Sequence, residues 1–76
     1  MKKDLQTMAY VRIMRKLRKR ARFSQQQVAE YLGTSQTMYS RYERAINEIP
    51  VSFVIALCEL YNITADQLLG LQPLDL

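Results

Sequence analysis

Residues 24–43 read SQQQVAEYLGTSQTMYSRYE, and this stretch predicts two short helices joined by a tight turn. Ser24 and Gln27 have the spacing of a capping box, in which a serine hydroxyl and a glutamine side chain bind free backbone N–H groups at a helix start. The first helix should therefore begin after Ser24 and run to Leu32. Gly33 should end it, because glycine readily adopts the left-handed backbone conformation that closes many helices.

A second helix is expected to follow at once. Thr34 or Ser35 can cap its first turn, Tyr39 and Tyr42 lie at apolar helical spacing, and the helix should end near Arg44. Two short helices joined by a tight glycine-containing turn cross at a steep angle, which is the helix-turn-helix geometry. In that geometry the second helix enters the major groove of DNA while the first crosses the phosphate backbone.

Helical spacing of apolar residues continues on both sides of this pair. One helix is expected over 8–20, and Pro50 suits the first position of a fourth helix. Thr64 and Gln67 repeat the capping-box spacing and predict a short fifth helix that ends at Gly70. The residues expected to face the core from the first and fourth helices are Tyr10, Ile13, Met14, Leu17 and Ala21, and Phe53 or Val54, Leu57, Cys58 and Tyr61.

These elements predict an all-α fold, a compact five-helix domain with a central helix-turn-helix. The chain has 76 residues, which is enough for one domain. Only two Gly and two Pro are present, which argues against strands joined by tight turns. Residues 1–7 should form an N-terminal arm, 8–70 the domain, and 71–76 a frayed tail.

The composition excludes several kinds of site. The chain has no His, which excludes a His-based metal site or catalytic triad, and its single Cys58 cannot form an intramolecular disulfide. The sequence also has no glycine-rich phosphate loop and no acid pair that suggests a catalytic cleft. We therefore expect a protein that is not an enzyme and that uses no metal, no cofactor and no small-molecule ligand.

The charge is strongly polarised along the chain. Residues 1–22 hold nine of the eleven Lys and Arg residues and one of the seven acidic residues. Residues 23–44 are balanced, and 45–76 hold four acidic residues and no basic one. A basic end of this kind predicts a polyanionic partner such as DNA, RNA or an anionic membrane surface.

The sequence favours a soluble protein. No apolar run of the signal-peptide type follows the charged N-terminus, and the stretch Val51–Leu60 is too short to span a bilayer. The basic first helix is a weak candidate for a membrane surface, because its narrow apolar face is needed for the core. We expect a cytoplasmic, nucleoid-associated protein.

A set of residues spread over about 8–70 forms a recognisable pattern: Arg18, Ser24-Gln25, Val28-Ala29, Leu32–Ser35, Tyr39–Glu43, Ile49-Pro50, Leu57, Tyr61, Ile63 and Asp66–Gly70. On these residues the chain resembles the phage repressor and Cro type of helix-turn-helix domain, also called Xre-like. The resemblance implies five helices, of which the third reads DNA bases.

By position, the resemblance implies that Gln36, Thr37 and Arg41 contact base edges, with Ser40 beside them. The chemistry agrees, because Gln can bind adenine N6 and N7 together and Arg can bind guanine O6 and N7 together. The methyl group of a Thr can contact thymine.

The resemblance also implies contacts to the DNA backbone. Gln25, at the start of the first helix of the pair, matches the family residue that holds a phosphate, assisted by the helix N-terminus. We expect further phosphate contacts from Arg22, Ser35 and Arg44.

Two further features follow from the resemblance. Arg18 and Glu43 match a family pair that is mainly structural and that would hold the base-reading helix in place. The family usually has Gly two residues after this Glu, whereas this chain has Ala45, for which a left-handed backbone is unfavourable. Either the third helix extends into the loop, or Asn47 takes the left-handed position.

The leading hypothesis is a sequence-specific double-stranded DNA-binding transcriptional regulator, acting as a repressor and reading the major groove with residues 35–44. The alternative is an antitoxin or adaptor that binds a protein partner through the acidic and apolar residues 45–76. A regulatory protein partner is compatible with both. We also expect a homodimer, because two-fold operators place half-sites one helical turn apart. The expected dimer contacts are Ile63, Leu68, Leu69, Leu71 and Leu74.

Overall fold

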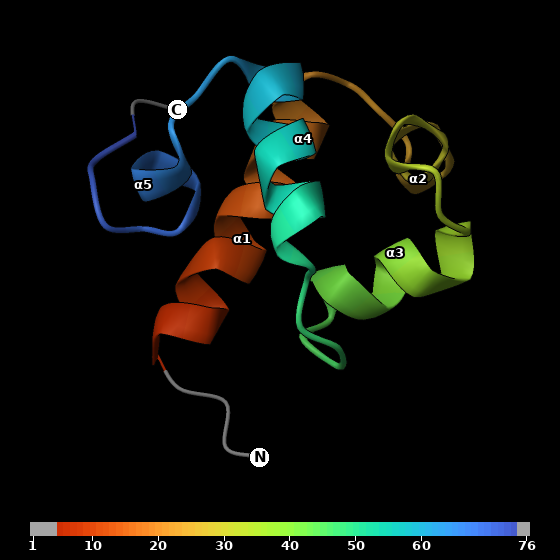
Figure 1. The fold of residues 1–76 in the computed structure, drawn as a ribbon, viewed down its shortest axis with the longest axis horizontal. Coiled ribbons are helices and arrows are strands. Elements are labelled where there is room, and N and C mark those ends of the chain that lie inside the picture. The colour runs from red at the N-terminus through yellow and green to blue at the C-terminus, as the bar shows by residue number, and fades with distance from the viewer. Residues whose placement is uncertain (1–4, 75–76) are drawn as a thin grey trace.

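The computed structural model describes residues 5–74 of the chain. Within this part it contains helices and no strand, which confirms the all-α prediction (Figure 1). The predicted arm begins outside the described residues, and the first helix starts three residues earlier than the predicted start at position 8. The elements are α1 (Leu5–Arg20), α2 (Gln25–Leu32), α3 (Gln36–Glu43), α4 (Val51–Tyr61) and α5 (Ala65–Leu68).

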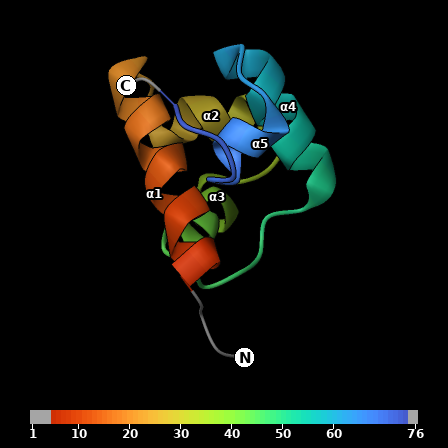
Figure 2. The same ribbon diagram turned by 90° about the vertical axis from the view of Figure 1, so that its left-hand side faces the viewer.

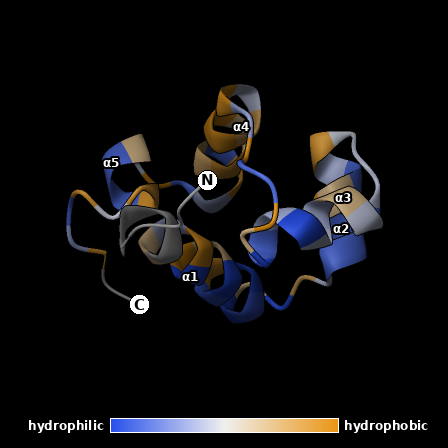
Figure 3. Ribbon diagram, turned by 90° about the horizontal axis from the view of Figure 1, so that it is seen from below, coloured by the Kyte–Doolittle hydropathy of each residue, from blue (hydrophilic) through white to orange (hydrophobic). Residues whose placement is uncertain are grey.

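The arrangement places α3 at one side of the molecule. In Figure 1, α2 is seen end-on and α3 lies across the view, so the two helices cross steeply as the sequence predicts. Figure 2 shows α1 and α4 on opposite sides of the view, with the other helices between them. In Figure 3 the C-terminal part of α1 is coloured hydrophilic and α4 is largely apolar. No helix of the described part is long and apolar enough to cross a membrane.

The core draws on all five helices of the described part. Removing the apolar side chains of the core from water is the main favourable contribution to folding. From α2 the predicted residues Val28, Ala29 and Leu32 are buried, which confirms that part of the prediction. The other buried members of the apolar cluster are Met14, Leu17, Tyr39, Tyr42, Leu57 and Leu68.

The buried face of α1 differs from the predicted one. Val11 is buried although it was not predicted to face the core, and Ala21 is exposed although it was. Tyr10 and Ile13 are only half-buried. Met14 and Leu17 are buried as predicted, and Arg18 on the same helix faces Glu43.

The helix starts follow the predicted caps closely. Both capping boxes are present, at Ser24 with Gln27 and at Thr64 with Gln67. Between the two candidates for the α3 cap, the structure uses Ser35, whose hydroxyl accepts a hydrogen bond from the backbone N–H of Met38 at 3.1 Å. Proline precedes α4 rather than occupying its first position, so this prediction was wrong by one residue.

Each helix of the described part is followed by a residue with a left-handed backbone. At each of these sites the next residue's N–H reaches back to a carbonyl of the last turn, for example from Ile46 to Arg41 at 2.9 Å, which is the Schellman pattern. Ala45 adopts the left-handed conformation itself, with φ of 59°, so both alternatives considered for this position were wrong. The five left-handed residues are Arg22, Gly33, Ala45, Asn62 and Gly70.

Residues 71–74 pack back onto the domain. Leu74 lies against the apolar core, and the side-chain amide of Gln67 donates a hydrogen bond to the carbonyl of Pro73 at 3.3 Å. A Cβ placed at Gly70 would lie 3.2 Å from the Cβ of Ala9, so the chain passes close to α1 at this point. The segment from Gly70 to Leu74 therefore covers part of α1.

Candidate nucleic-acid interface

A single buried carboxylate holds α3 in place. Glu43 is 1% exposed and lies at the last position of α3. The guanidinium of Arg18 donates to both of its oxygens, from Nε to Oε2 at 2.7 Å and from Nη2 to Oε1 at 3.1 Å. The pair that the family resemblance implies is therefore present and bidentate, the strongest arrangement for such a pair.

Two further side chains donate to the same carboxylate. The hydroxyl of Tyr39 donates to Oε2, and the amide of Gln25 donates to Oε1 at 3.1 Å. Arg15 binds the backbone carbonyl of Glu43 at 2.8 Å, which satisfies a free acceptor at the end of α3. These contacts join α1, α2 and α3 at one residue, so the orientation of α3 does not depend on apolar packing alone.

The ionisation states of this network follow from its contacts. Burial raises the pKa of Glu43, but the hydrogen bonds from Arg18, Tyr39 and Gln25 outweigh it, and the net pKa lies below the usual value. The hydrogen bond to Glu43 raises the pKa of Arg18. Burial, and then the Glu43 carboxylate, raise the pKa of Tyr39. At neutral pH the network is therefore an ion pair with a neutral phenol.

The outer face of α3 carries polar side chains opposite the buried ones. Gln36 and Thr37 are exposed, and Ser40 and Arg41 are half-buried. Thr37, Ser40 and Arg41 are spaced at three and four residues, so they share one face of the helix. The fold thus brings the predicted base-reading residues together on the exposed side of α3.

The two arginines of this region are held differently. Arg41 donates from Nε to the side-chain oxygen of Asn47 at 2.6 Å. Arg44, one turn after Ser40, is exposed and donates from Nε to the Ser40 hydroxyl at 3.2 Å. The partner of Arg41 is thus a neutral residue of the following loop, which the sequence did not reveal.

Three of the four predicted phosphate contacts lie at or just before the starts of α2 and α3, and the fourth, Arg44, lies at the end of α3. Ser35 is the N-cap of α3, so its hydroxyl oxygen already accepts a backbone hydrogen bond. Gln25 uses one amide hydrogen for Glu43, which leaves the other for a ligand. Arg22 is exposed in the turn before α2, and Arg44 is exposed at the end of α3.

Three contributors to the site were missed or only partly identified from the sequence. Arg15 was counted only as part of the basic run, and Asn47 only as a turn residue. Tyr39 was identified as a core residue, which is correct, but its hydrogen bond to Glu43 was not. The spacing of four residues between Tyr39 and Glu43 places them on one helix face and was the available signal.

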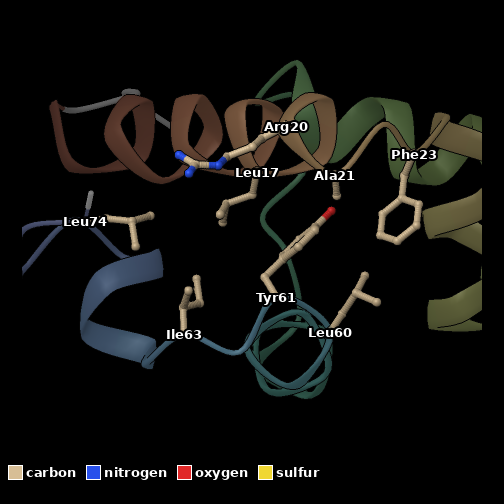
Figure 4. Close-up of a pocket in the computed structure, with 8 residues that line it drawn as sticks. All are labelled: Leu17, Arg20, Ala21, Phe23, Leu60, Tyr61, Ile63 and Leu74. Atoms are coloured by element: carbon tan, nitrogen blue, oxygen red, sulfur yellow. The ribbon is translucent and has the colours of Figure 1, made fainter. Parts of the chain in front are cut away.

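The predicted dimer contacts differ widely in exposure. Leu68 is 1% exposed and belongs to the core, and Leu69 is half-buried. Ile63 and Leu74 line a hollow of about 410 Å³ between α1 and α4, where Figure 4 shows both side chains beneath α1. Of the predicted set, Leu71 is the strongly exposed member, at 59%.

A different apolar surface is exposed at the start of α4. Val51 is 75% exposed and Ile55 is 57% exposed, and their spacing of four residues places them on one helix face. Ile46, in the loop between α3 and α4, is also exposed.

Comparisons with known proteins agree with this geometry. A family model described as Helix-turn-helix (HTH_3) matches residues 14–68. The chain is 32% identical over 62 residues to an uncharacterized HTH-type transcriptional regulator, YobD, of Bacillus subtilis (strain 168). That similarity covers 82% of this chain and 55% of the relative, so the chain spans little more than half of the relative's length. No solved structure matches the chain. The family match extends from the middle of α1 to the end of α5, and the chain therefore belongs to the Xre/Cro-like helix-turn-helix family.

Proposed function

We propose that this chain is a sequence-specific double-stranded DNA-binding transcriptional regulator that acts as a repressor and reads the major groove with α3. The observation that carries the proposal is the division of α3 into two faces. Tyr39, Tyr42 and Glu43 are buried on one side, and the predicted base-reading side chains lie on the other. A helix fixed by its inner face can present its outer face to a groove without reorganisation.

The proposed roles follow from side-chain chemistry and position. Gln36 and Arg41 are the strongest readers, because each can make two hydrogen bonds to one base. Thr37 and Ser40 contact the neighbouring base edges. The proposed phosphate contacts are Arg22, Gln25, Ser35 and Arg44, which position the domain on the duplex without specifying a sequence.

The basic surface of α1 would supply long-range attraction. Exposed Arg12, Lys16, Lys19 and Arg20 extend along its outer side. Charges of this kind raise the rate of encounter with DNA and make affinity fall as salt increases. Only part of this surface can face DNA together with α3. We therefore assign base specificity to α3 and not to α1. A regulator of this kind would be associated with the nucleoid.

We propose a homodimer on DNA, with the exposed apolar surface at the start of α4 as the contact. Two-fold symmetric operators pair two copies on half-sites one turn apart. Val51 and Ile55 are more exposed than Leu68, Leu69 and Leu74 of the predicted set, and they lie together on one face of α4. Burial of two aliphatic side chains from each copy stabilises such a contact.

The experiment that tests the proposed function is selection from a random duplex DNA library with the wild-type chain. Enrichment of a defined sequence is the expected result. The same selection with Arg41→Ala should give a site in which one base pair is no longer specified. If the wild-type chain enriches no sequence while retaining its helical circular dichroism spectrum, the proposal is wrong.

A further inference from the structure

The loop between α3 and α4 folds back onto one base-reading residue. The left-handed Ala45 reverses the chain, and the backbone N–H groups of Ile46 and Asn47 point to the carbonyl of Arg41, at 2.9 and 3.4 Å. The side chain of the same asparagine then accepts the Nε hydrogen of Arg41 at 2.6 Å. Asn47 therefore contacts both the backbone and the side chain of Arg41.

This contact restricts how Arg41 can meet a base. A guanidinium has donors at Nε and at its two terminal amines, and a base can be bound either through both terminal amines or through Nε and one of them. Because Asn47 occupies Nε, the pair of terminal amines remains for a base. Neither of them donates a hydrogen bond within residues 9–74, the part of the chain whose side chains are described.

Arg44 provides an internal comparison. It lies near the same end of α3 but is exposed, and its Nε is shared between the Ser40 hydroxyl at 3.2 Å and the Ser40 carbonyl at 3.4 Å. These contacts are longer than the Arg41–Asn47 bond and come from the arginine's own helix. Arg44 is therefore suited to a phosphate, which tolerates many approach directions, whereas Arg41 is oriented by a separate segment of chain.

From this geometry we propose that Asn47 is a specificity-determining positioning residue, which presents the terminal amines of Arg41 to a guanine and so sets the base preference at that position. The inference rests on the proposed DNA-binding function. A bidentate contact depends on the angle between donor pair and base edge, so a guanidinium that swings freely distinguishes guanine less well.

The test is selection from random duplex DNA with the wild-type chain, Arg41→Ala, Asn47→Ala and Asn47→Asp. Arg41→Ala identifies the base pair that Arg41 reads. Asn47→Ala should reduce the guanine preference at that same base pair about tenfold and leave the other positions unchanged. Asn47→Asp keeps the accepting oxygen and should retain the preference. The double variant Arg41→Ala with Asn47→Ala should lose no more base preference than Arg41→Ala alone, because both substitutions remove the same Arg41–Asn47 contact.

Controls separate a positioning role from a structural one. Glu48→Gln changes the exposed neighbouring residue in the same loop and should leave the base preference unchanged. Thermal unfolding of each variant reports whether the domain still folds. If Asn47→Ala does not fold, Asn47→Ser is used instead, because its hydroxyl is too short to reach Nε and the same loss of preference is expected.

The outcomes distinguish this inference from the proposed function. If the wild-type chain and Asn47→Ala select the same guanine equally strongly, the inference is overturned and the proposed function stands. A uniform loss of affinity without a change in preference also overturns it, because that is the effect of a phosphate or structural contact. If the wild-type chain selects no sequence at all, the proposed function fails.

Discussion

Arg18 and Glu43 are 25 positions apart in the chain, and their side chains meet through two hydrogen bonds of 2.7 and 3.1 Å. The side chain of Glu43 is 2% exposed and that of Arg18 is 13% exposed, so the pair is largely shielded from water. The charge of either residue is tolerated there only while the other is present. This relationship joins the basic helix α1 to α3, the proposed base-reading helix.

Glu43→Gln should destabilise the domain by about 3 kcal/mol, because it leaves the Arg18 guanidinium largely buried without a counter-charge. Urea unfolding followed by circular dichroism measures the effect. Glu59→Gln is the matched control, since Glu59 is exposed on α4, and it should change the free energy of unfolding by less than about 0.5 kcal/mol. Equal effects of the two substitutions would show that the buried pair has no special role.

The stability of the domain should fall at acid pH through Glu43. The pKa of Glu43 is lowered in the folded state from an ordinary value of 4.5, so the unfolded state binds a proton more readily. The stabilisation is therefore complete above about pH 4.5 and is lost as the pH falls through the lower folded-state pKa. The difference in unfolding free energy between wild type and Glu43→Gln should shrink between pH 5 and pH 3. If this difference in unfolding free energy stays constant as the pH falls below about 4.5, the acid sensitivity does not come from Glu43.

At positions with a left-handed backbone, a change to glycine should stabilise the domain and a change from glycine should destabilise it. Arg22→Gly should stabilise the domain by about 0.5–1 kcal/mol, because Arg22 is exposed and has φ of 62°. Gly33→Ala should destabilise it by about 1 kcal/mol through backbone strain alone, since the added methyl group meets no atom within 4 Å. Ala45→Gly should stabilise less than Arg22→Gly, because it also removes a buried methyl group. Thermal unfolding ranks the three variants, and a larger gain at Ala45 than at Arg22 is the contrary result.

Two arginines of the interface should respond differently to salt and sequence. Arg41→Ala should cost about 1–3 kcal/mol on the selected site and much less on random DNA. Arg44→Ala should weaken binding to both DNAs alike and reduce the salt slope by about one. Fluorescence anisotropy at several salt concentrations measures both quantities. An unchanged slope would remove Arg44 from the phosphate contacts.

Association of two copies should depend on the start of α4. A Val51→Glu, Ile55→Glu double variant places charge on both exposed aliphatic positions and should shift the molar mass on DNA from two copies to one. Leu71→Glu is the control, because Leu71 is similarly exposed but lies after α5. Light scattering over a range of concentrations gives the mass. Dissociation by Leu71→Glu alone would place the contact at the other end of the domain.

Local chemistry explains which features were predictable from sequence. The two capping boxes and the end of α2 at Gly33 depend on neighbouring residues, and each was correct. The identity of the Arg18 partner came from the family resemblance, since a separation of 25 positions gives no local signal. The exact buried face of α1 and the conformation of Ala45 depend on tertiary contacts, which override the intrinsic preference of a single residue.

The candidate site shows the same distinction. The family resemblance assigned Gln36, Thr37 and Arg41 by position, and helical periodicity agrees, because it places these positions away from the buried ones once the helix is located. The bond from Arg41 to Asn47 could not be predicted, because it requires the exact path of a loop that begins with an unfavourable alanine conformation.

The division of α3 into an inner and an outer face has a consequence for changing the operator. The residues that hold the helix and the residues proposed to read bases are different side chains, so Gln36, Thr37 and Ser40 can be exchanged with little effect on the folded framework. Arg41 is the exception, because its partner lies outside the helix. A new specificity grafted onto this domain can therefore be encoded within one short helix at three positions, but the fourth has to be redesigned together with the loop.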